Sequence, residues 1–423
     1  MVKYTYVARR QSNSFCLIAA GGVMIMKPKF LYFQPEITIT TLSGILWGLI
    51  ELGYEAREGQ ILVPDSEYDD EILSKVKSVL DQGSSDEIVI TQDFCAVVAQ
   101  ACHEKNRIYI SWVYDSPQRA LYMREALYDT NIIFVFDKTQ FSRLKEVGLK
   151  NLFYEPLAGN ITKAGTFAPF KNELAEYKSD ISFVGNLYSD SIRESLFAGT
   201  DGTVLEEGNK LITSVTGKWD KDSGVFNKVS DEYIRFIYER MSHEGEEIYN
   251  ISPRFLVETL VLAYEKSSRD RIEALRKLSE KMQVTLYTSK DISGDLKDKL
   301  KCKGYVSYDE GMPKVFLSSK ININITMSGI ETGIPQRVFD IMSYGGFCLT
   351  DWRPEIEELF ESGKEIVTAH SADEMTEKAD YYLKHDRERL DIAAAGYKRV
   401  KEQYSYPKAV SRIINKTKEV FGI

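Results

Sequence analysis

Residues 328–351 read SGIETGIPQRVFDIMSYGGFCLTD. The small residues of 328–333 predict a loop, and Pro335 favours the first turn of a helix. Two glycines beginning at Gly345 predict the end of that helix, and residues 347–350 are typical of a short buried strand. This stretch therefore predicts a loop, a helix and a buried strand in succession.

The start of this predicted helix has the properties of an anion-binding site, because its first backbone N–H groups have no partner within the helix. Helical spacing places Arg337, Asp340 and Tyr344 on the polar face. Arg337 can donate paired hydrogen bonds to phosphate oxygens, and Asp340 can accept them from the vicinal hydroxyls of a sugar. The combination indicates a diphosphate with a ribose attached. The alternative is an exposed ion pair worth less than about 1 kcal/mol.

Strands and helices alternate on both sides of this stretch. In the first third of the chain, strands are predicted at residues 29–34, 87–91, 107–113, 132–136 and 151–154. After residue 179, they are predicted at residues 180–186, 284–288, 304–308, 321–326, 347–350 and 365–368. Such alternation is typical of parallel, doubly wound α/β sheets, which bind ligands beyond the carboxyl ends of their strands. Three carboxylates are therefore expected near a cleft: Asp93, Asp115 and Asp137.

The two runs of alternation predict two Rossmann-like domains that face a cleft. The N-terminal domain is expected over residues 26–160, and residues 161–179, which lack clear periodicity, are expected to form a linker. The C-terminal domain is expected over residues 180–395, with a mostly helical insert at 190–260. Closing helices are expected at 396–423.

The first 25 residues are expected to lie outside the folded unit. An apolar run at residues 15–26 is too short to span a bilayer, so no transmembrane segment is expected. Lys27, Pro28 and Lys29 follow this run where a signal peptide would have a small-residue cleavage site. These features predict a cytoplasmic protein.

Charge and cysteine usage narrow the function classes. The net charge is −9 and there is no long basic run, which argues against a dedicated nucleic-acid-binding protein. The five cysteines show neither CxxC nor zinc spacing, which indicates a reducing compartment and no structural metal. The single Asp-x-Asp, formed by Asp220 and Asp222, is interpreted as part of a surface loop.

Several short runs together resemble a known family. Residues 180–420 resemble the glycosyl transferases group 1 C-terminal domain, which also occurs in spore-maturation-type proteins. The runs that carry this resemblance are residues 183–186, 304–306, 321–326, 335–340, 351–360 and 393–397. The N-terminal half, with SWVYDSP at 111–117, resembles a bacterial glycosyltransferase-like N-terminal domain. The whole then resembles a GT-B glycosyltransferase, and the closing helix after Tyr406 is expected to pack on the first domain.

The resemblance implies that a sugar is transferred from a nucleotide-diphosphate sugar, with a UDP-sugar as the expected donor. The acceptor would be a glycan, a protein or a lipid-linked molecule bound by the N-terminal domain. In such families the carboxylate at Asp340 holds the ribose. Arg337, with Lys314 or Lys320, would neutralise the diphosphate leaving group without a metal.

Other residues of the implied donor site follow from the same resemblance. Gly185 and Asn186 would allow close approach of the backbone to the donor. The backbone at Tyr305 and Val306 would meet the base, and Gly333 belongs to the loop that precedes the donor-binding helix.

The candidate catalytic residues are Asp115, Glu331 and Arg337. Many retaining GT-B enzymes carry two glutamates eight positions apart. Here Asp340 stands at the second position, the residue eight positions before it is Thr332, and Glu331 lies one position earlier still. This departure leaves the stereochemistry and the role of Glu331 open. If the enzyme inverts, Asp115 is placed to take the acceptor's proton; the alternative is that Asp115 caps a helix that begins at Pro117.

Two other functions remain open at this point. The same scaffold serves nucleotide-sugar epimerases, which usually need histidine, but the four histidines of this chain are scattered. A non-catalytic spore or cell-surface assembly protein would keep the fold without turnover.

Overall fold

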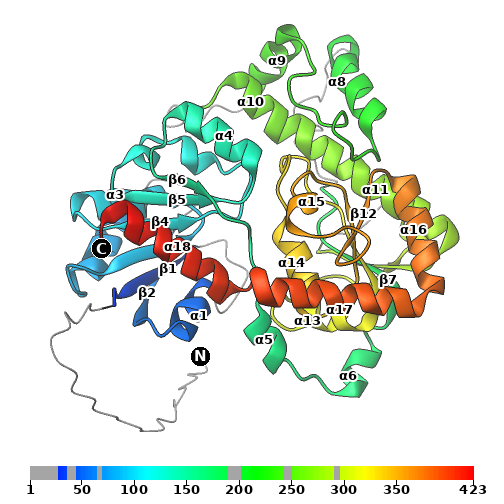
Figure 1. Cartoon of the computed structure of the whole chain (residues 1–423). Helices are drawn as coiled ribbons and strands as arrows, with labels where there is room; N and C mark the ends of the chain where they lie inside the picture. Colours follow the sequence, from blue (N-terminus) through cyan, green and yellow to red (C-terminus); the bar gives the residue numbers. More distant parts are fainter. Residues whose placement is uncertain (1–26, 36–43, 64–68, 189–201, 242–249, 290–295) are drawn as a thin grey trace.

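The computed structural model describes residues 27–35, 44–63, 69–188, 202–241, 250–289 and 296–423. The prediction for residues 1–25 therefore concerns a segment outside the described residues. Figure 1 shows two lobes joined near the middle of the chain, with a helical layer above the junction.

The N-terminal domain is built on a parallel sheet of six strands in the order β2-β1-β3-β4-β5-β6. The strands are β1 (Phe30–Pro35), β2 (Ala56–Val63), β3 (Ile88–Gln92), β4 (Tyr109–Trp112), β5 (Asn131–Val135) and β6 (Leu152–Tyr154). The helices are α1 (Gly44–Glu51), α2 (Asp70–Asp81), α3 (Ala96–Glu104), η1 (Arg119–Tyr122), η2 (Arg124–Leu127) and α4 (Lys138–Val147). The prediction missed β2, a strand at the edge of the sheet that begins with the polar run Ala-Arg-Glu-Gly.

The C-terminal domain is built on a second parallel sheet, in the order β12-β11-β10-β7-β8-β9. Its strands are β7 (Ser179–Val184), β8 (Val284–Tyr287), β9 (Lys301–Cys302), β10 (Ser319–Asn324), β11 (Cys348–Asp351) and β12 (Val367–Ala369). The predicted fold class, two parallel doubly wound sheets, is confirmed. The prediction of a strand at 304–308 was wrong: the edge strand is the two-residue β9, and Gly304 then turns the chain with a φ of +72°.

Helices account for most of the remaining described chain. Between the sheets lie α5 (Ile161–Thr166) and α6 (Lys171–Ala175). The helical insert contains α8 (Gly202–Val215), α9 (Asp231–Tyr238), α10 (Pro253–Val257) and the π-helical turn η4 (Glu258–Ala263), which continues into α11 (Tyr264–Lys281). The other helices are α12 (Leu296–Lys299), α13 (Gly311–Ser318), α14 (Gln336–Ser343), α15 (Ile356–Leu359), α16 (Ala372–Lys384), α17 (Asp386–Gln403) and α18 (Tyr406–Phe421).

The last helix, α18, returns to the N-terminal domain, as Figure 1 shows. Glycines in α1 permit this contact: a Cβ at Gly44 would lie 2.2 Å from the ring of Tyr406, and one at Gly48 would lie 2.8 Å from Val410. Arg412 Nε also donates to Glu155 Oε1 at 3.0 Å. The predicted packing of the closing helix on the first domain is therefore confirmed.

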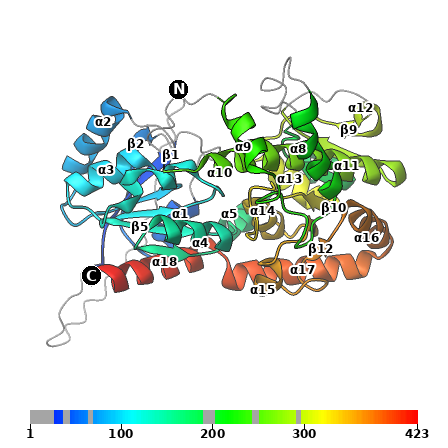
Figure 2. The same cartoon turned by 90° about the horizontal axis from the view of Figure 1, so that it is seen from above.

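The insert has its own small core and lies over the junction of the two domains. Ile212, Val257 and Ile237 are among the residues of this core. In Figure 2, α10 lies between the blue strands of the N-terminal sheet and the helices of the C-terminal domain. The buried Asp270 of α11 connects α11 to the chain that follows α8. It accepts hydrogen bonds from the backbone N–H of Gly217 at 2.7 Å and from Trp219 Nε1 at 3.2 Å.

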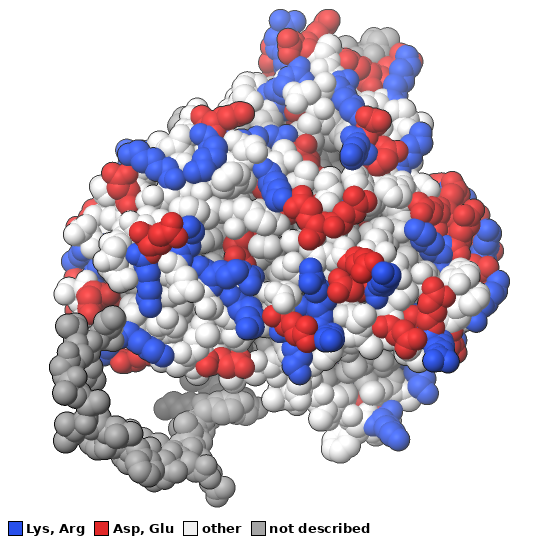
Figure 3. All heavy atoms as spheres, in the orientation of Figure 1, with Lys and Arg blue, Asp and Glu red and all other residues white. Residues whose placement is uncertain are grey.

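Charges on the face shown in Figure 3 are interspersed, with lysines and arginines beside aspartates and glutamates. In the part of the chain that the structure describes, no helix is both long and apolar enough to cross a membrane.

Candidate active site

A cavity of about 560 Å³ lies between the two sheets at the carboxyl ends of their strands. Its lining includes the loop after β4 (114–119) and the ends of β7 and β10 with the loops that follow them (183–186 and Tyr188; 324–327 and Ile330). The start of α14 (335–337), part of the insert (251–264) and Arg271 complete it. This is the position and the size expected for a ligand site in doubly wound sheets. Of the predicted site residues, the structure brings Asp115, Gly185, Asn186 and Arg337 together around this cavity.

The turn after β7 presents its backbone to the cavity. The N–H of Gly185 donates to the carbonyl oxygen of Tyr287 at 3.0 Å, which continues the pairing of β7 with β8. The side chain of Asn186 accepts from the N–H of Tyr188 at 2.8 Å, and Tyr188 has a φ of +54°. The sequence predicted a turn at Gly185 and Asn186 because a short apolar strand ends there.

Arg271, on α11, is a cavity residue that the sequence analysis missed. Its guanidinium lies 5.6 Å from the ring centre of Phe183 and 4.5 Å from that of Tyr188. It donates from Nη2 to the carbonyl oxygen of Ile325 at 2.8 Å. Burial lowers the pKa of Arg271, and the positive charge of Arg337, which lines the same cavity, contributes to the lowering.

A signal for Arg271 was present in the sequence. Residues three, four and seven positions later, Ala274, Leu275 and Leu278, are fully buried. Arg271 therefore falls on the apolar stripe of α11. A charged side chain on such a stripe is rarely fully buried unless it is paired or functional.

Arg337 lies in the first turn of α14, which begins directly after Pro335, as predicted. Its Nη1 is 2.6 Å from the sulfur of Met312 and 3.7 Å from Asp340 Oδ2. The ion pair with Asp340, which was the alternative interpretation, is thus present but long. The guanidinium also faces the cavity, so the ion pair does not account for its placement.

Asp340 is buried, so the alternative interpretation of an exposed ion pair does not describe it. Its Oδ1 accepts from the hydroxyl of Tyr308 at 2.8 Å and from Gln336 Nε2 at 2.9 Å. Burial raises the pKa of Asp340, while Arg337 acts in the opposite direction. Asp340 is not among the residues that line the cavity, and its contact with a ribose stays a prediction.

Gln336, which the sequence analysis did not select, lies between Asp340 and the cavity. Its Nε2 donates to Asp340 and to the carbonyl oxygen of Ala158, the latter at 2.9 Å. Among the described residues, no group donates to its buried Oε1. Asp340 therefore orients the amide of a residue that lines the cavity, and the oxygen of that amide is buried.

Glu331 and Gly333 lie at the contact between the two domains and do not line the cavity. The N–H of Glu331 donates to Asp137 Oδ2 at 2.9 Å, and the carboxylate of Glu331 pairs with Arg143 of α4. A Cβ at Gly333 would lie 2.9 Å from Phe136, both its ring and its carbonyl oxygen. This loop therefore fastens the domains together.

Asp137 serves both domains at this contact. It caps α4, because Oδ1 accepts from the N–H groups of Thr139 at 2.8 Å and Gln140 at 3.2 Å. The same carboxylate accepts from the hydroxyl of Thr332 at 2.9 Å. Asp137 is therefore occupied by structural hydrogen bonds.

The other residues assigned to the donor also lie away from the cavity lining. Tyr305 is 63% exposed and Val306 is buried. Lys314 pairs with Glu173 at 2.7 Å, and Lys320 pairs with Asp180 at 2.7 Å. The arginines that do line the cavity in the described chain are Arg119, Arg271 and Arg337.

Asp115 follows β4 and is exposed at the cavity. Its loop is held in place because Asp93 Oδ1 accepts from the N–H groups of Tyr114 at 2.7 Å and Asp115 at 3.2 Å. The short helix that follows is η1, and its N-cap is Gln118. The alternative interpretation, in which Asp115 caps a helix beginning at Pro117, was therefore wrong.

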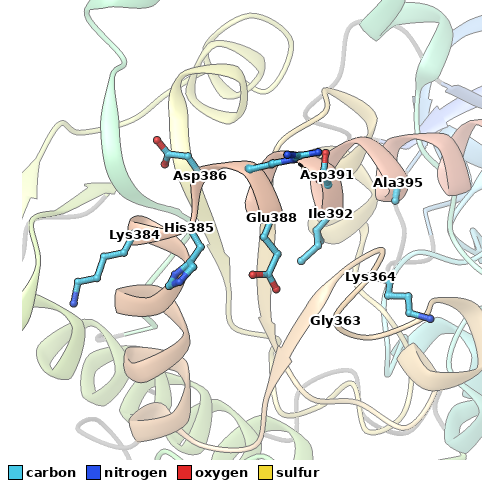
Figure 4. A pocket seen from close by; sticks show the side chains of 10 residues that line it. Gly363, Lys364, Lys384, His385, Asp386, Glu388, Asp391, Ile392 and Ala395 are labelled. Atoms are coloured by element: carbon cyan, nitrogen blue, oxygen red, sulfur yellow. Dashed lines mark ion pairs between the residues drawn. The ribbon is translucent and has the colours of Figure 1, made fainter.

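A second hollow, of about 700 Å³, lies on the outer surface of α16 and α17 (Figure 4). Its charged side chains pair locally, for example Lys384 with Asp380 at 2.6 Å and Arg387 with Asp391 at 4.0 Å. Gly363, which also lines this hollow, precedes β12, so the hollow lies near the amino end of that strand. Ligands of doubly wound sheets bind beyond the carboxyl ends of the strands instead. The cavity between the sheets is therefore the better candidate for chemistry.

Within the described residues, no group of three or more histidines, cysteines, aspartates or glutamates is arranged to hold a metal ion.

Burial also acts on the carboxylates of the domain contact, and this gives a testable pH effect. Glu355 accepts from the hydroxyl of Tyr154 at 2.6 Å and from the N–H of Lys138 at 2.9 Å, and burial raises its pKa, with Asp137 adding to the rise. Because the folded pKa lies above the unfolded one, folding favours the protonated form, so this group's contribution to stability is lost as the pH rises through the folded value.

We expect Glu355→Gln to remove that loss, since glutamine can accept from Lys138 N–H and donate to the Tyr154 hydroxyl. The free energy of unfolding of the variant, relative to that of the parent, should rise as the pH increases above about 4.5, as measured by urea unfolding. Glu361→Gln, at an exposed position, should show no such trend. A difference that stays constant over this pH range would contradict the prediction.

Comparisons with known proteins fit this geometry. Residues 268–415 match a family model described as glycosyl transferase-like. The sequence matches none of the curated proteins at a significant level.

Several solved structures share this architecture. Anabaena HepE, solved in complex with UDP, matches with a TM-score of 0.53 at 8% identity, over 92% of this chain and 100% of that one. HepE in complex with UDP-glucose matches equally well, over 92% and 99% of the two chains. Sucrose-phosphate synthase from Thermosynechococcus elongatus matches with a TM-score of 0.52 at 8% identity, over 94% and 100%. At these identities the likeness is one of fold, and it extends over both sheets.

Proposed function

We propose that this chain is a glycosyltransferase of the group 1 type, and that it transfers a sugar from a nucleotide-diphosphate sugar to an acceptor hydroxyl in the cavity between its domains. UDP is the expected nucleotide, because HepE has been solved with UDP and with UDP-glucose. The observation that carries the proposal is the placement of Arg271 and Arg337 on one cavity, beside the backbone of Gly185.

The two arginines suit a diphosphate leaving group. As the bond from the sugar's anomeric carbon to the diphosphate breaks, negative charge grows on the diphosphate oxygens, and fixed cations stabilise that charge without reorganising. Arg271 is pre-oriented by aromatic rings and by the carbonyl oxygen of Ile325. Arg337 adds a second cation and the N-terminal turn of α14. We propose that these cations replace a metal.

Hydroxyl groups of the donor find an acceptor in Gln336. Gln336 lines the cavity, and a small movement of its amide would let Oε1 accept from a sugar or ribose hydroxyl while Nε2 stays bonded to Asp340. We therefore propose that Gln336, rather than Asp340, contacts the ribose, and that Asp340 positions Gln336.

On the acceptor side, Asp115 is the proposed general base. The acceptor oxygen attacks the anomeric carbon, its proton passes to the Asp115 carboxylate, and the nucleoside diphosphate leaves. Direct attack by the acceptor inverts the configuration at that carbon. The pairing of Glu331 with Arg143 at the domain contact supports this route, because it holds Glu331 away from the cavity.

The experiment that tests the donor site is a thermal-shift panel of UDP, GDP, ADP and CDP. A nucleotide at about 100 times its dissociation constant stabilises the folded state by about 2.7 kcal/mol, which a melting curve readily detects. We expect UDP to give the largest rise in Tm, unchanged when EDTA replaces added Mg²⁺. Absence of any rise at millimolar nucleotide would contradict the proposed donor site, and loss of the rise with EDTA would contradict metal independence.

A further inference from the structure

One wall of the cavity comes from the helical insert and is apolar. It consists of Ile251, Phe255, Leu260 and Tyr264, which we call the insert wall. These side chains lie in α10, in the π-helical turn η4 and at the ends of the adjoining segments, and all four are half-buried. π-helical turns within α-helices occur frequently at functional sites. The insert therefore presents apolar surface to the candidate active site.

The insert wall is fastened to the N-terminal domain. The ring of Phe255 lies 5.4 Å from that of Tyr122, and the N–H of Asn250 donates to the carbonyl oxygen of Tyr122 at 2.8 Å. The guanidinium of Arg143 lies 5.1 Å from the centre of the Phe255 ring. Tyr122 belongs to η1, in the same loop region as Asp115. The wall thus adjoins the acceptor side of the cavity.

The charged groups of the lining lie outside the insert wall, and Arg119 of η1 adds a cation in the same loop region as Asp115. The donor side has the backbone of Gly185 and the cations Arg271 and Arg337, which suit a charged and polar nucleotide sugar. None of the four side chains of the insert wall is charged. A sugar diphosphate gains little from such a surface, whereas an apolar group gains the free energy of leaving water.

We propose that the acceptor carries a hydrocarbon group next to the hydroxyl that receives the sugar, and that the insert wall binds this group. The inference rests on the proposed sugar transfer and adds the chemical class of the acceptor. Because the wall and Asp115 lie on the same side of the cavity, the hydrocarbon also positions the hydroxyl for attack on the donor. A wholly hydrophilic acceptor would leave the wall exposed to water.

The test uses methyl, butyl and hexyl β-D-glucoside as probes, with affinities measured by calorimetric titration. Each methylene that is fully buried strengthens binding about fourfold. Hexyl glucoside is therefore expected to bind at least about tenfold more tightly than methyl glucoside. Equal affinities, or no measurable binding of the hexyl compound at 10 mM, would overturn the proposal.

Two matched variants locate the effect. Leu260→Ala should lower the hexyl-to-methyl affinity ratio severalfold, whereas Leu390→Ala, at a 62% exposed leucine of α17, should leave it unchanged. An unchanged ratio in Leu260→Ala would overturn the proposal. If Leu260→Ala melts at a markedly lower temperature, Ile251→Ala repeats the test.

The nucleotide-induced rise in Tm, measured on the same samples, separates this inference from the proposed function. We expect that rise to be equal in the parent and in both leucine variants, because the insert wall does not bind the nucleotide. A retained preference for hexyl glucoside without any nucleotide effect would reject the donor site alone. A nucleotide effect without alkyl preference would reject the insert wall alone.

Discussion

Asp115→Asn is expected to lower the rate of sugar transfer by about 10²–10⁴-fold while leaving nucleotide binding unchanged. Asparagine has nearly the shape of aspartate, and the loop is held by backbone N–H groups that donate to Asp93, so the geometry should persist. What the variant lacks is a group that takes the acceptor's proton. The measurement is kcat for transfer from the nucleotide sugar identified by its Tm effect, together with that Tm effect in the variant.

A control for this substitution is Asp129→Asn, in the same domain, where the carboxylate is exposed and pairs with Lys150. Its kcat should equal that of the parent. A kcat for Asp115→Asn within threefold of the parent would remove Asp115 from the mechanism. Retention of configuration at the anomeric carbon, seen by NMR of the first product formed, would also contradict the inverting route.

Much of the fold could be predicted from the sequence because its signals are local. Residues 321–351 contain a buried strand, a loop, a helix and another strand in order, and the structure has β10, α14 and β11 there. The errors lie at sheet edges, where a strand is paired on one side only and its sequence is less apolar. The missed β2 and the misplaced strand at 304–308 are both of this kind.

The candidate site was predictable only where one segment supplies both the residue and its orientation. Gly185 ends a strand and Arg337 begins a helix, so their directions follow from their own elements. Arg271 reaches the cavity because α11 packs against the C-terminal sheet, where Arg271 donates to the carbonyl oxygen of Ile325, and Asp340 is covered by Tyr308 from a distant loop. Helical periodicity gives the face of a residue but not the neighbour that covers it.

The same limit explains Glu331. Its distance along the chain from Asp340 resembled a catalytic spacing, but the packing of the two domains determines its partner, which is Arg143. Spacing within one segment contains no information about α4, which lies nearly two hundred residues earlier. Carboxylate spacing alone is therefore weak support for a catalytic role, because the packing of the two domains decides which group the carboxylate contacts.

Arg337→Met is expected to weaken UDP binding by about 10–150-fold, since a hydrogen bond to a charged group contributes about 1.5–3 kcal/mol. Methionine suits the site, because Met312 and the ring of Phe316 already surround this side chain. Uridine, which lacks the phosphates, should bind the variant and the parent with affinities within about twofold. Calorimetric titration of both ligands gives the two ratios.

Arg387→Met is the matched control, because this arginine of α17 has a side chain that is 97% exposed and lies in the outer hollow rather than in the cavity. It should bind UDP as the parent does. If Arg337→Met weakened uridine as much as UDP, the substitution would have disturbed the whole cavity and the diphosphate would have to lie elsewhere. Selective loss of UDP affinity instead requires that the phosphates meet the first turn of α14, where the second cation, Arg271, already lies close by.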